Sequence, residues 1–268
     1  MTVNIIDGKA IAQQIRLELK RQLEERRKKD LITPGLAVIL VGEDVASQIY
    51  VRNKRDACRD VGINSFAFDL PKYITENELF TLIRKLNIDP KVHGILIQLP
   101  LPPSINTAHI IESIDPKKDV DGFHPINLGL LAQGRPFLRP CTPYGVMRLL
   151  AYEKISLRGL NAVIVGTSNI VGKPMALELL NAGCTITLCH SATRDLQHHI
   201  QQADILVSAI VVIDIGITRA PSGKLHGDIE FSTAKEIAAY ITPVPGGVGP
   251  MTVAMLLENT LFAAENAS

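Results

Sequence analysis

The sequence has neither an excess of charge of one sign nor a long apolar run. Its 268 residues include 28 Lys and Arg against 27 Asp and Glu, so no surplus positive charge favours a nucleic-acid backbone or an anionic membrane. No apolar run approaches the ~18 residues of a membrane span, and residues 1–10 lack the apolar core and cleavage site of a secretory signal. We therefore expect a cytoplasmic protein whose partners are small molecules, not nucleic acid or membrane.

Cysteine is also scarce. The four cysteines lack the paired CxxC spacing of a zinc site, and they are too few for a disulfide scaffold. We predict that they are reduced packing residues and that the chain has no metal site. The four are Cys58, Cys141, Cys184 and Cys189.

The chain does contain an alternation of strand-like and helix-like segments. Its length fits two modest domains better than one. Buried strands that alternate with amphipathic helices are typical of parallel sheets covered on both faces, so the predicted fold class is α/β with two domains. Residues 115–143, rich in Pro, Gly and Asp, are interpreted as an interdomain stretch. We expect strands at 36–41, 65–70, 94–99, 162–165 and 185–189, and helices from residue 9, at 45–61, 76–86, 144–152 and 173–182.

One apolar run does not fit this alternation. Residues 205–217 are about twice as long as a typical strand and divide into two strand-like halves at Ile210 and Val211. Neighbouring parallel strands need a crossover of about a dozen residues. We therefore predict that a connecting segment is missing here, either deleted from the chain or left unseen in its structure.

A turn with glycine at both ends follows the predicted strand 162–165. It reads GTSNIVG from Gly166 through Ser168 to Gly172 and enters a helix. Backbone N–H groups at such a helix start, together with the helix dipole, favour a pyrophosphate. The GxSxxxG pattern predicts a dinucleotide site in a Rossmann-like domain, although any strand-to-helix turn in such a sheet can carry glycines.

The tip of the next strand indicates which dinucleotide binds. NAD-specific sites usually place an acid there for the ribose 2′-hydroxyl. Here residues 190–194 read HSATR, and the first acid after the strand is Asp195. Lys173, Ser191 and Arg194 could instead surround a 2′-phosphate, which favours NADP. The alternative is that Lys173 and Arg194 are ordinary surface charges.

Lys54 is a charge within an apolar stripe formed by positions 46, 50, 54, 57 and 61 of the helix 45–61. Its stem could extend to water. If the amine is instead desolvated, it holds its proton less tightly and becomes an acid or base usable near neutral pH. Tyr50, one turn earlier, offers an aromatic face to a bound ring or simply packs.

Two further polar residues stand at places where ligands bind. Gln98 is the only polar side chain in GILIQLP, at the carboxyl end of a buried strand, where α/β sheets bind ligands. A buried amide must be hydrogen-bonded, so Gln98 has either a structural partner or Lys54. Asp121 in DVDGFHP is either a binding residue or the first residue of an Asp-Gly turn.

The string PVPGGVGP at residues 243–250 combines rigidity with an accessible backbone. Prolines stiffen it, and glycines let a ligand approach the main chain closely. We interpret Pro243, Gly246 and Gly247 as part of a substrate-facing segment and not a linker.

Taken together, these strings resemble one family, the bifunctional methylenetetrahydrofolate dehydrogenase/cyclohydrolases. The matches occur in order and span nearly the whole chain. They are YVRNK at 50–54, GILIQLPLP at 94–102, DVDGFHP at 119–125, GTSNIVGKPM at 166–175 and TPVPGGVGPMTV at 242–253.

The resemblance implies oxidation of 5,10-methylenetetrahydrofolate to the methenyl form with NADP, followed by hydrolysis to 10-formyltetrahydrofolate in the same cleft. It implies that Lys54 is the acid/base of hydrolysis and that Gln98 orients it. Tyr50 would pack on the folate, and Asp121 would bind the pterin ring. The implied cofactor contacts are Gly166, Thr167, Ser168, Lys173, Ser191 and Ile217.

The resemblance also implies the domain arrangement. Residues 1–140 would form the folate-binding catalytic domain, completed by the final helix at 251–268, and residues 141–250 would form the NADP-binding domain. Two chains would pair as a homodimer through their cofactor domains. The family has an extra loop and helix between Ile210 and Val211, so a true deletion would alter the nicotinamide side of the site.

Two other functions compete with the bifunctional enzyme. A dehydrogenase without cyclohydrolase activity is disfavoured because Lys54, Gln98 and Tyr50 are present together. A non-catalytic dinucleotide sensor would be indicated by an altered Lys54 beside an intact 166–172 turn, and this sequence shows no such loss.

Overall fold

The computed structural model describes residues 3–207, 211–213, 218–219, 225–226, 231 and 238–267. The chain divides into two compact units, one of residues 1–13 and 140–254 and the other of residues 14–139 and 255–268. Helices α1 (Gly8–Lys28) and α10 (Val248–Glu265) each begin in the first unit and end in the second. This division differs from the predicted one mainly at the amino terminus, because β1 (Asn4–Ile5) pairs in parallel with β11 (Tyr240–Ile241).

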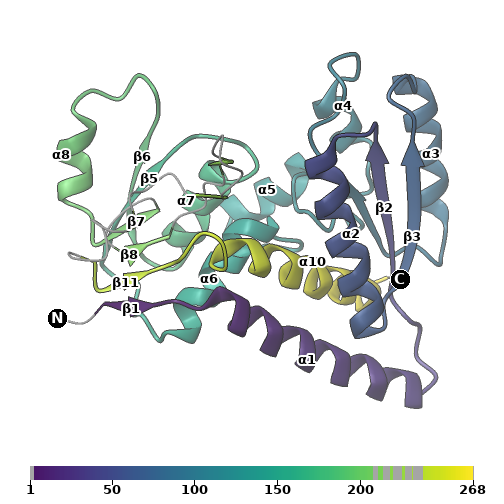
Figure 1. The fold of residues 1–268 in the computed structure, drawn as a ribbon, viewed down its shortest axis with the longest axis horizontal. Helices are drawn as coiled ribbons and strands as arrows, with labels where there is room; N and C mark the ends of the chain where they lie inside the picture. The colour runs from purple at the N-terminus through teal and green to yellow at the C-terminus, as the bar shows by residue number, and fades with distance from the viewer. Residues whose placement is uncertain are drawn as a thin grey trace. The chain divides into compact units, whose positions relative to one another are not determined.

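The unit of residues 14–139 and 255–268 is built on a parallel sheet in the order β3-β2-β4, and we call it the three-stranded unit. Its strands are β2 (Gly35–Val41), β3 (Asn64–Leu70) and β4 (Gly94–Ile97), close to the predicted bounds. The central strand β2 is buried along its whole length, as its continuous apolar run predicts. Connecting helices α2 (Val45–Val61) and α3 (Glu76–Ile88) also match the prediction (Figure 1).

Local signals set the ends of these helices. The carboxylate of Asp44 accepts a hydrogen bond from Ser47 N at the start of α2, and Gly62 ends that helix in the left-handed conformation at φ 96°. Thr75 and Glu78 form a capping box at the start of α3. The hydrophobic core beneath α3 contains side chains from α3 and from the sheet, including Ile39 of β2, Ile83 of α3 and Ile95 of β4.

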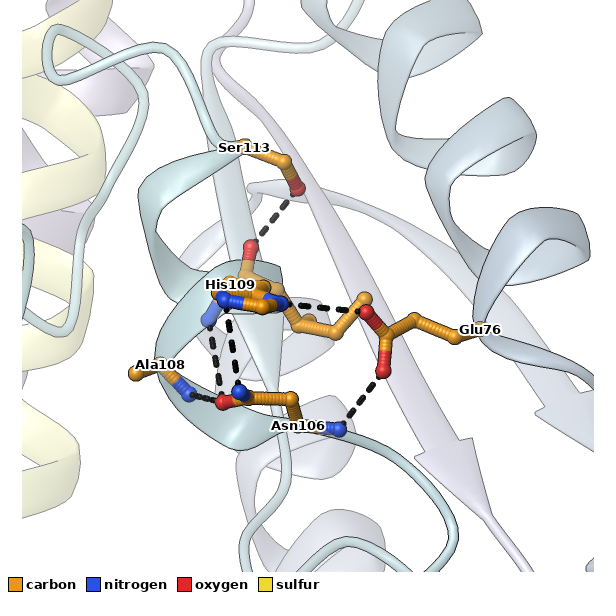
Figure 2. A network of polar contacts seen from close by, with 6 residues as sticks. Glu76, Asn106, Ala108, His109 and Ser113 are labelled. Carbon is orange, nitrogen blue, oxygen red and sulfur yellow. Dashed lines mark hydrogen bonds and ion pairs between the residues drawn. The ribbon is translucent and has the colours of Figure 1, made fainter.

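A polar network joins the start of α3 to the start of α4 (Thr107–Glu112). The carboxylate of Glu76 accepts a hydrogen bond from Asn106 N at 2.7 Å and contacts His109 Nδ1 at 3.3 Å (Figure 2). Asn106 in turn caps α4 by accepting from Ala108 N at 3.0 Å. The backbone hydrogen bond from Asn106 lowers the pKa of Glu76, which keeps the Glu76 carboxylate ionised.

The interpretation of residues 115–143 as an interdomain stretch is wrong for most of its length. Residues up to 139 belong to the three-stranded unit. Ile95 N donates to Lys118 O at 2.7 Å, and Asp119 forms a parallel bridge with Ile95, so the segment lies along β4. Helix α5 (Pro125–Ala132) follows, with Pro at its first position and His124 as its cap. Here Asp119 and Gly122 close a tight turn and Pro125 opens α5, roles that composition alone does not distinguish from a linker.

The unit of residues 1–13 and 140–254 contains a six-stranded parallel sheet in its described part, in the order β1-β11-β8-β7-β5-β6, and we call it the six-stranded unit. Helix α6 (Cys141–Tyr152) leads into strand β5, and β5, α7 and β6 form the βαβ unit that the sequence predicts, with helix α8 after it (Figure 1). β9 (Thr218–Arg219) and β10 (Leu225–His226) form a separate antiparallel pair. The remaining elements are β5 (Asn161–Val165), α7 (Gly172–Asn181), β6 (Thr185–Cys189), α8 (Leu196–Gln201), β7 (Ile205–Val207) and β8 (Val211–Val212).

The apolar run at 205–217 does contain two strands, β7 and β8, which are parallel neighbours with Leu206 opposite Val212. Numbering is continuous from Ile210 to Val211, so no segment is left unseen there. Residues 208–210, which join the two strands, and residues 214–217 lie outside the described part of the chain.

Candidate active site

Lys54 and Gln98 meet at the carboxyl-end edge of the three-stranded sheet. Helix α2 follows β2, and Gln98 follows β4, which is the neighbour of β2. Lys54 Nζ donates a hydrogen bond to Gln98 Oε1 at 3.1 Å. Gln98 Nε2 donates to Leu99 O at 2.8 Å, which turns the amide so that its oxygen faces Lys54. Gln98 therefore has both the structural partner and the functional partner that the sequence offered as alternatives.

The predicted apolar stripe on α2 is correct only in its second half. Positions 57 and 61 are buried, but Ala46 is exposed and Tyr50 is 43% exposed. Helix α2 packs on β2 and β3, and its buried face instead includes Ser47 and Val51. Lys54 is half-buried, at the border between the buried face and the exposed one. Tyr50 lies one turn before Lys54, with its ring accessible to a ligand.

The four cysteines behave as the sequence predicts, since all are free and buried. Cys58 lies one turn after Lys54, and burial raises the pKa of its thiol to about 12. Its thiol therefore stays protonated beside Lys54 and contributes packing. Among the described residues, no group of three or more His, Cys, Asp or Glu could hold a metal ion.

Asp121 lies in a turn that begins beside strand β4. The bridge between Ile95 and Asp119 is parallel. Val120, the residue before Asp121, lies beside Gly94 at the start of β4, where a Cβ on Gly94 would be 2.7 Å from Val120 Cγ1. Asp121 is half-buried there, in a turn closed by Gly122 N donating to Asp119 O at 3.0 Å. The Asp-Gly turn of the sequence is thus present.

Two buried residues beside this turn were missed at the level of sequence. Asp119 accepts hydrogen bonds from within the turn, and Asn259 of α10 donates to the carbonyl oxygen of Val120. Asp119 lies inside the DVDGFHP string, and Asn259 is a buried amide within the mostly apolar helix α10. A polar residue in an apolar helix face was the signal that could have found Asn259.

The 166–172 turn leaves β5 at the carboxyl-end edge of the six-stranded sheet. β6 and β7 lie on opposite sides of β5, so the strand order reverses at this point, where such sheets bind ligands. Gly166 has φ 119°, and a Cβ on Gly172 would lie 1.9 Å from Gly166 O. Ser168 Oγ accepts from Val171 N and Gly172 N, each at 3.2 Å, which holds the turn against the start of α7. The tight, bare backbone fits a pyrophosphate group.

The other predicted cofactor residues lie around the same edge. Lys173 is exposed, and its ammonium donates to Asn169 Oδ1 at 2.7 Å. Ser191 is exposed just beyond β6, and Thr167 is half-buried in the turn. Asp195, the first acid after β6, caps α8 by accepting from His198 N. Ile217 lies outside the residues that the structure describes.

The string PVPGG follows β11 at this same sheet edge. Gly247 N donates to Pro243 O at 2.8 Å, and Gly246 has φ 110°. Gly246 O accepts from Lys9 N at 2.8 Å, and a Cβ on Gly8 would lie 1.9 Å from Gly247 O. These glycines therefore allow the turn to pack against the start of α1, a role that the sequence reasoning did not anticipate.

A parallel sheet with a glycine turn at its switch point defines an α/β dinucleotide-binding protein, and the paired lysine and amide add a site for acid/base chemistry. Family models agree with this class. Residues 6–121 match the tetrahydrofolate dehydrogenase/cyclohydrolase catalytic domain, and residues 140–268 match the NAD(P)-binding domain of the same family.

Solved structures of high similarity point the same way. A bifunctional methylenetetrahydrofolate dehydrogenase/cyclohydrolase from Campylobacter jejuni is 48% identical, with a TM-score of 0.95 and 100% of both chains covered. A Trypanosoma brucei enzyme of this type, complexed with NADP cofactor and inhibitor, is 37% identical, with a TM-score of 0.93, 100% of this chain and 99% of that chain covered. One from Thermoplasma acidophilum is 32% identical, with a TM-score of 0.89 and 98% of each chain covered.

The chain therefore belongs to the tetrahydrofolate dehydrogenase/cyclohydrolase family. It is a bifunctional folate enzyme that oxidises 5,10-methylenetetrahydrofolate to the methenyl form and hydrolyses that form to 10-formyltetrahydrofolate. Its second domain binds a nicotinamide dinucleotide. In the described residues, no helix is both long and apolar enough to cross a membrane.

Proposed function

We propose that Lys54, Gln98, Tyr50 and Asp121 act on the folate and that the dinucleotide is NADP. The hydrogen bond between Lys54 Nζ and Gln98 Oε1 is the observation that carries this proposal. Gln98 is locked by its bond to Leu99 O, so its oxygen can only accept from the lysine. Gln98 occupies one position on the Lys54 nitrogen, and the other positions stay available to exchange a proton with the substrate.

Hydrolysis of the methenyl form requires a water molecule to attack the one-carbon bridge and lose a proton. Lys54 accepts that proton when neutral and returns it to the folate nitrogen that leaves. Tyr50 supplies an exposed ring face one turn away, suited to stacking on the folate. Asp121 binds the pterin through its carboxylate, which accepts hydrogen bonds from ring N–H groups. Pro243, Gly246 and Gly247 are also proposed to contact the substrate.

Gly166, Thr167 and Ser168 would hold the pyrophosphate of the cofactor. When bound, NADP supplies the acceptor for the hydride removed in the oxidation step. Lys173 and Ser191 favour the 2′-phosphate form, because both are exposed at the edge where the ribose would lie. Asp195 supports this preference, since its carboxylate already caps α8 and is not directed to a 2′-hydroxyl. The NADP bound to the Trypanosoma brucei enzyme agrees with this assignment.

The chain is also proposed to form a homodimer through the six-stranded unit. Exposed apolar side chains on α6 and α7, namely Tyr152 and Leu180, support this proposal. Light scattering of the purified chain should give twice the 29.2 kDa mass of one copy. A monomer across the micromolar range would contradict it.

The role of Lys54 is tested by the variant Lys54→Met, which keeps the stem and removes the amine. We expect hydrolysis of the methenyl substrate to fall by at least about 100-fold, consistent with the usual contribution of a general acid or base, while NADP affinity stays the same. Lys85→Met, an exposed lysine on α3, is the matched control and should change neither property. Normal hydrolysis by Lys54→Met would refute the assigned role.

The cofactor assignment is tested by comparing kcat/KM with NADP and with NAD. We expect a clear preference for NADP that shrinks in Lys173→Ala and Ser191→Ala, because each loses a group that binds the 2′-phosphate. Equal rates with the two cofactors under matched conditions would refute the role of these residues.

A further inference from the structure

We propose that Asp119 and Asn259 are positioning residues that hold the turn at 119–124 so that Asp121 meets the folate. The proposal rests on the pterin-binding role proposed above for Asp121. Neither residue needs to touch the substrate, because each acts on the backbone on one side of Asp121.

Asp119 holds the part of the turn that follows Asp121. Its side chain is 2% exposed. Its Oδ2 accepts from His124 N at 2.8 Å and from Asn127 Nδ2 at 2.9 Å. Asn127 is itself anchored, because the same amide nitrogen donates to Pro116 O at 2.9 Å. One buried carboxylate therefore joins the end of the turn to the first turn of α5.

The burial of Asp119 is costly, which suggests that it serves more than packing. Loss of solvent raises the pKa of the Asp119 carboxyl, and the hydrogen bonds from His124 N and Asn127 oppose this effect. An apolar residue in this place would avoid the cost of burying a charge. It would, however, leave His124 N and the amide of Asn127 without their acceptor.

Asn259 holds the part of the turn that precedes Asp121. It is 4% exposed on α10, and its Nδ2 donates to Val120 O and to Arg139 O, both at 2.8 Å. The two amide hydrogens thus bind two separate carbonyl groups. One of these, on Val120, belongs to the peptide bond that leads directly into Asp121.

Asp119 and Asn259 act on a turn that is already aligned with β4. Ile95 N donates to Lys118 O at 2.7 Å, and Val120 fills the space beside Gly94, where a Cβ would lie 2.7 Å from Val120 Cγ1. The same strand leads to Gln98, the partner of Lys54. The turn that carries Asp121 is therefore aligned with β4 and held on its two sides by Asp119 and Asn259. Such support of a binding residue reduces the ordering that the substrate must otherwise cause.

The test separates positioning from stability by measuring KM for the folate, KM for the dinucleotide and kcat in the same variants. Asn259→Ala removes both donors to the backbone. We expect folate KM to rise about tenfold in both reactions, with KM for NADP unchanged and kcat within about threefold. If Asn259→Ala does not fold, Asn259→Ser, which keeps one donor, takes its place and should show the same pattern with a smaller rise.

Two substitutions of Asp119, one that removes its oxygens and one that keeps an oxygen, test its role separately. Asp119→Ala removes the acceptor and should raise folate KM about tenfold. Asp119→Asn keeps one oxygen for His124 N and Asn127 Nδ2, so it should stay within about threefold of the parent. Equal folate KM values in the two Asp119 variants would overturn the positioning role of this residue.

Thr260 is the matched control on α10. It is fully buried next to Asn259, but its hydroxyl donates to Leu256 O within the helix at 2.7 Å. Thr260→Val should lower the thermal unfolding midpoint and leave folate KM unchanged. A rise in folate KM as large as that of Asn259→Ala would show that any damage to α10 has this effect, and would overturn the proposal.

A double-mutant cycle with Asp121→Ala distinguishes this proposal from the one on which it rests. If Asn259 acts through Asp121, Asn259→Ala should not raise folate KM further once Asp121 is alanine. Full additivity would overturn the positioning role while leaving the role of Asp121 intact. An unchanged folate KM in Asp121→Ala alone would instead refute the pterin-binding role, and the positioning proposal would fall with it.

Discussion

Replacing Gly172 by alanine should separate the two activities of the enzyme. The missing Cβ of Gly172 would lie 1.9 Å from Gly166 O and 3.1 Å from Thr167 N. The first distance is about 1.5 Å short of the 3.4 Å at which ordinary contact begins. Both clashing atoms belong to the backbone, so the 166–172 turn itself has to move apart.

The size of the effect follows from that displacement. Forcing an extra methyl group into a well-packed place typically costs about 1–3 kcal/mol. If the strain is relieved by opening the turn, it appears as lost cofactor affinity, and each 1.4 kcal/mol corresponds to about tenfold in Kd. We expect NADP to bind about 10-fold to 100-fold more weakly. Lys54 and Gln98 belong to the other unit, so hydrolysis of the methenyl substrate without cofactor should continue at its normal rate.

The assay is a titration of NADP binding together with rates of both reactions for Gly172→Ala. Gly129→Ala is the matched control, because Gly129 lies within α5 and has no atom within 4 Å of its added Cβ. It should keep NADP affinity and gain about 0.5–1 kcal/mol from better helix propensity. NADP affinity within twofold of the parent in Gly172→Ala would refute the assignment of this turn. An equal loss of both activities would show a general folding defect and refute the reasoning from local geometry.

Two further predictions concern pH. Gln98→Glu should move the acidic limb of the hydrolysis profile to higher pH, because a carboxylate 3.1 Å from Lys54 Nζ stabilises the charged ammonium; an unmoved profile would contradict the role of this pair. Burial, and after it the charge of Lys118, lowers the pKa of His93 below its usual 6.5. Between the two pKa values the unfolded chain binds a proton that the folded chain does not. The contribution of His93 to folding stability is therefore complete above pH 6.5 and is lost as pH falls towards the lowered pKa. His93→Asn keeps an acceptor for Gly35 N, 3.0 Å away in the parent, and its thermal midpoint should fall less between pH 7.5 and 5. Equal losses in the two proteins would show that His93 does not cause the decline.

Much of the local structure follows directly from the sequence. Helix α2 has the predicted bounds, and strands β2, β3 and β6 match within a residue, because their apolar runs and end signals act over a few neighbouring residues. The turn from Gly166 and the absence of an acid before Asp195 are likewise features of local sequence. The error on residues 115–143 arose because Pro, Gly and Asp favour turns in linkers and in helix caps alike.

The meeting of distant residues was decided only by the tertiary structure. Lys54 and Gln98 are 44 residues apart, and they pair because β2 and β4 are neighbours in the order β3-β2-β4. Hydrophobic periodicity predicts each strand but does not encode which strands lie side by side. The hydrogen bond from Asn259 to Val120, across 139 residues, is of the same kind. The sequence by itself determined the elements and the chemical groups available, whereas the order of the strands decided which groups share a site, because that order is set by long-range packing.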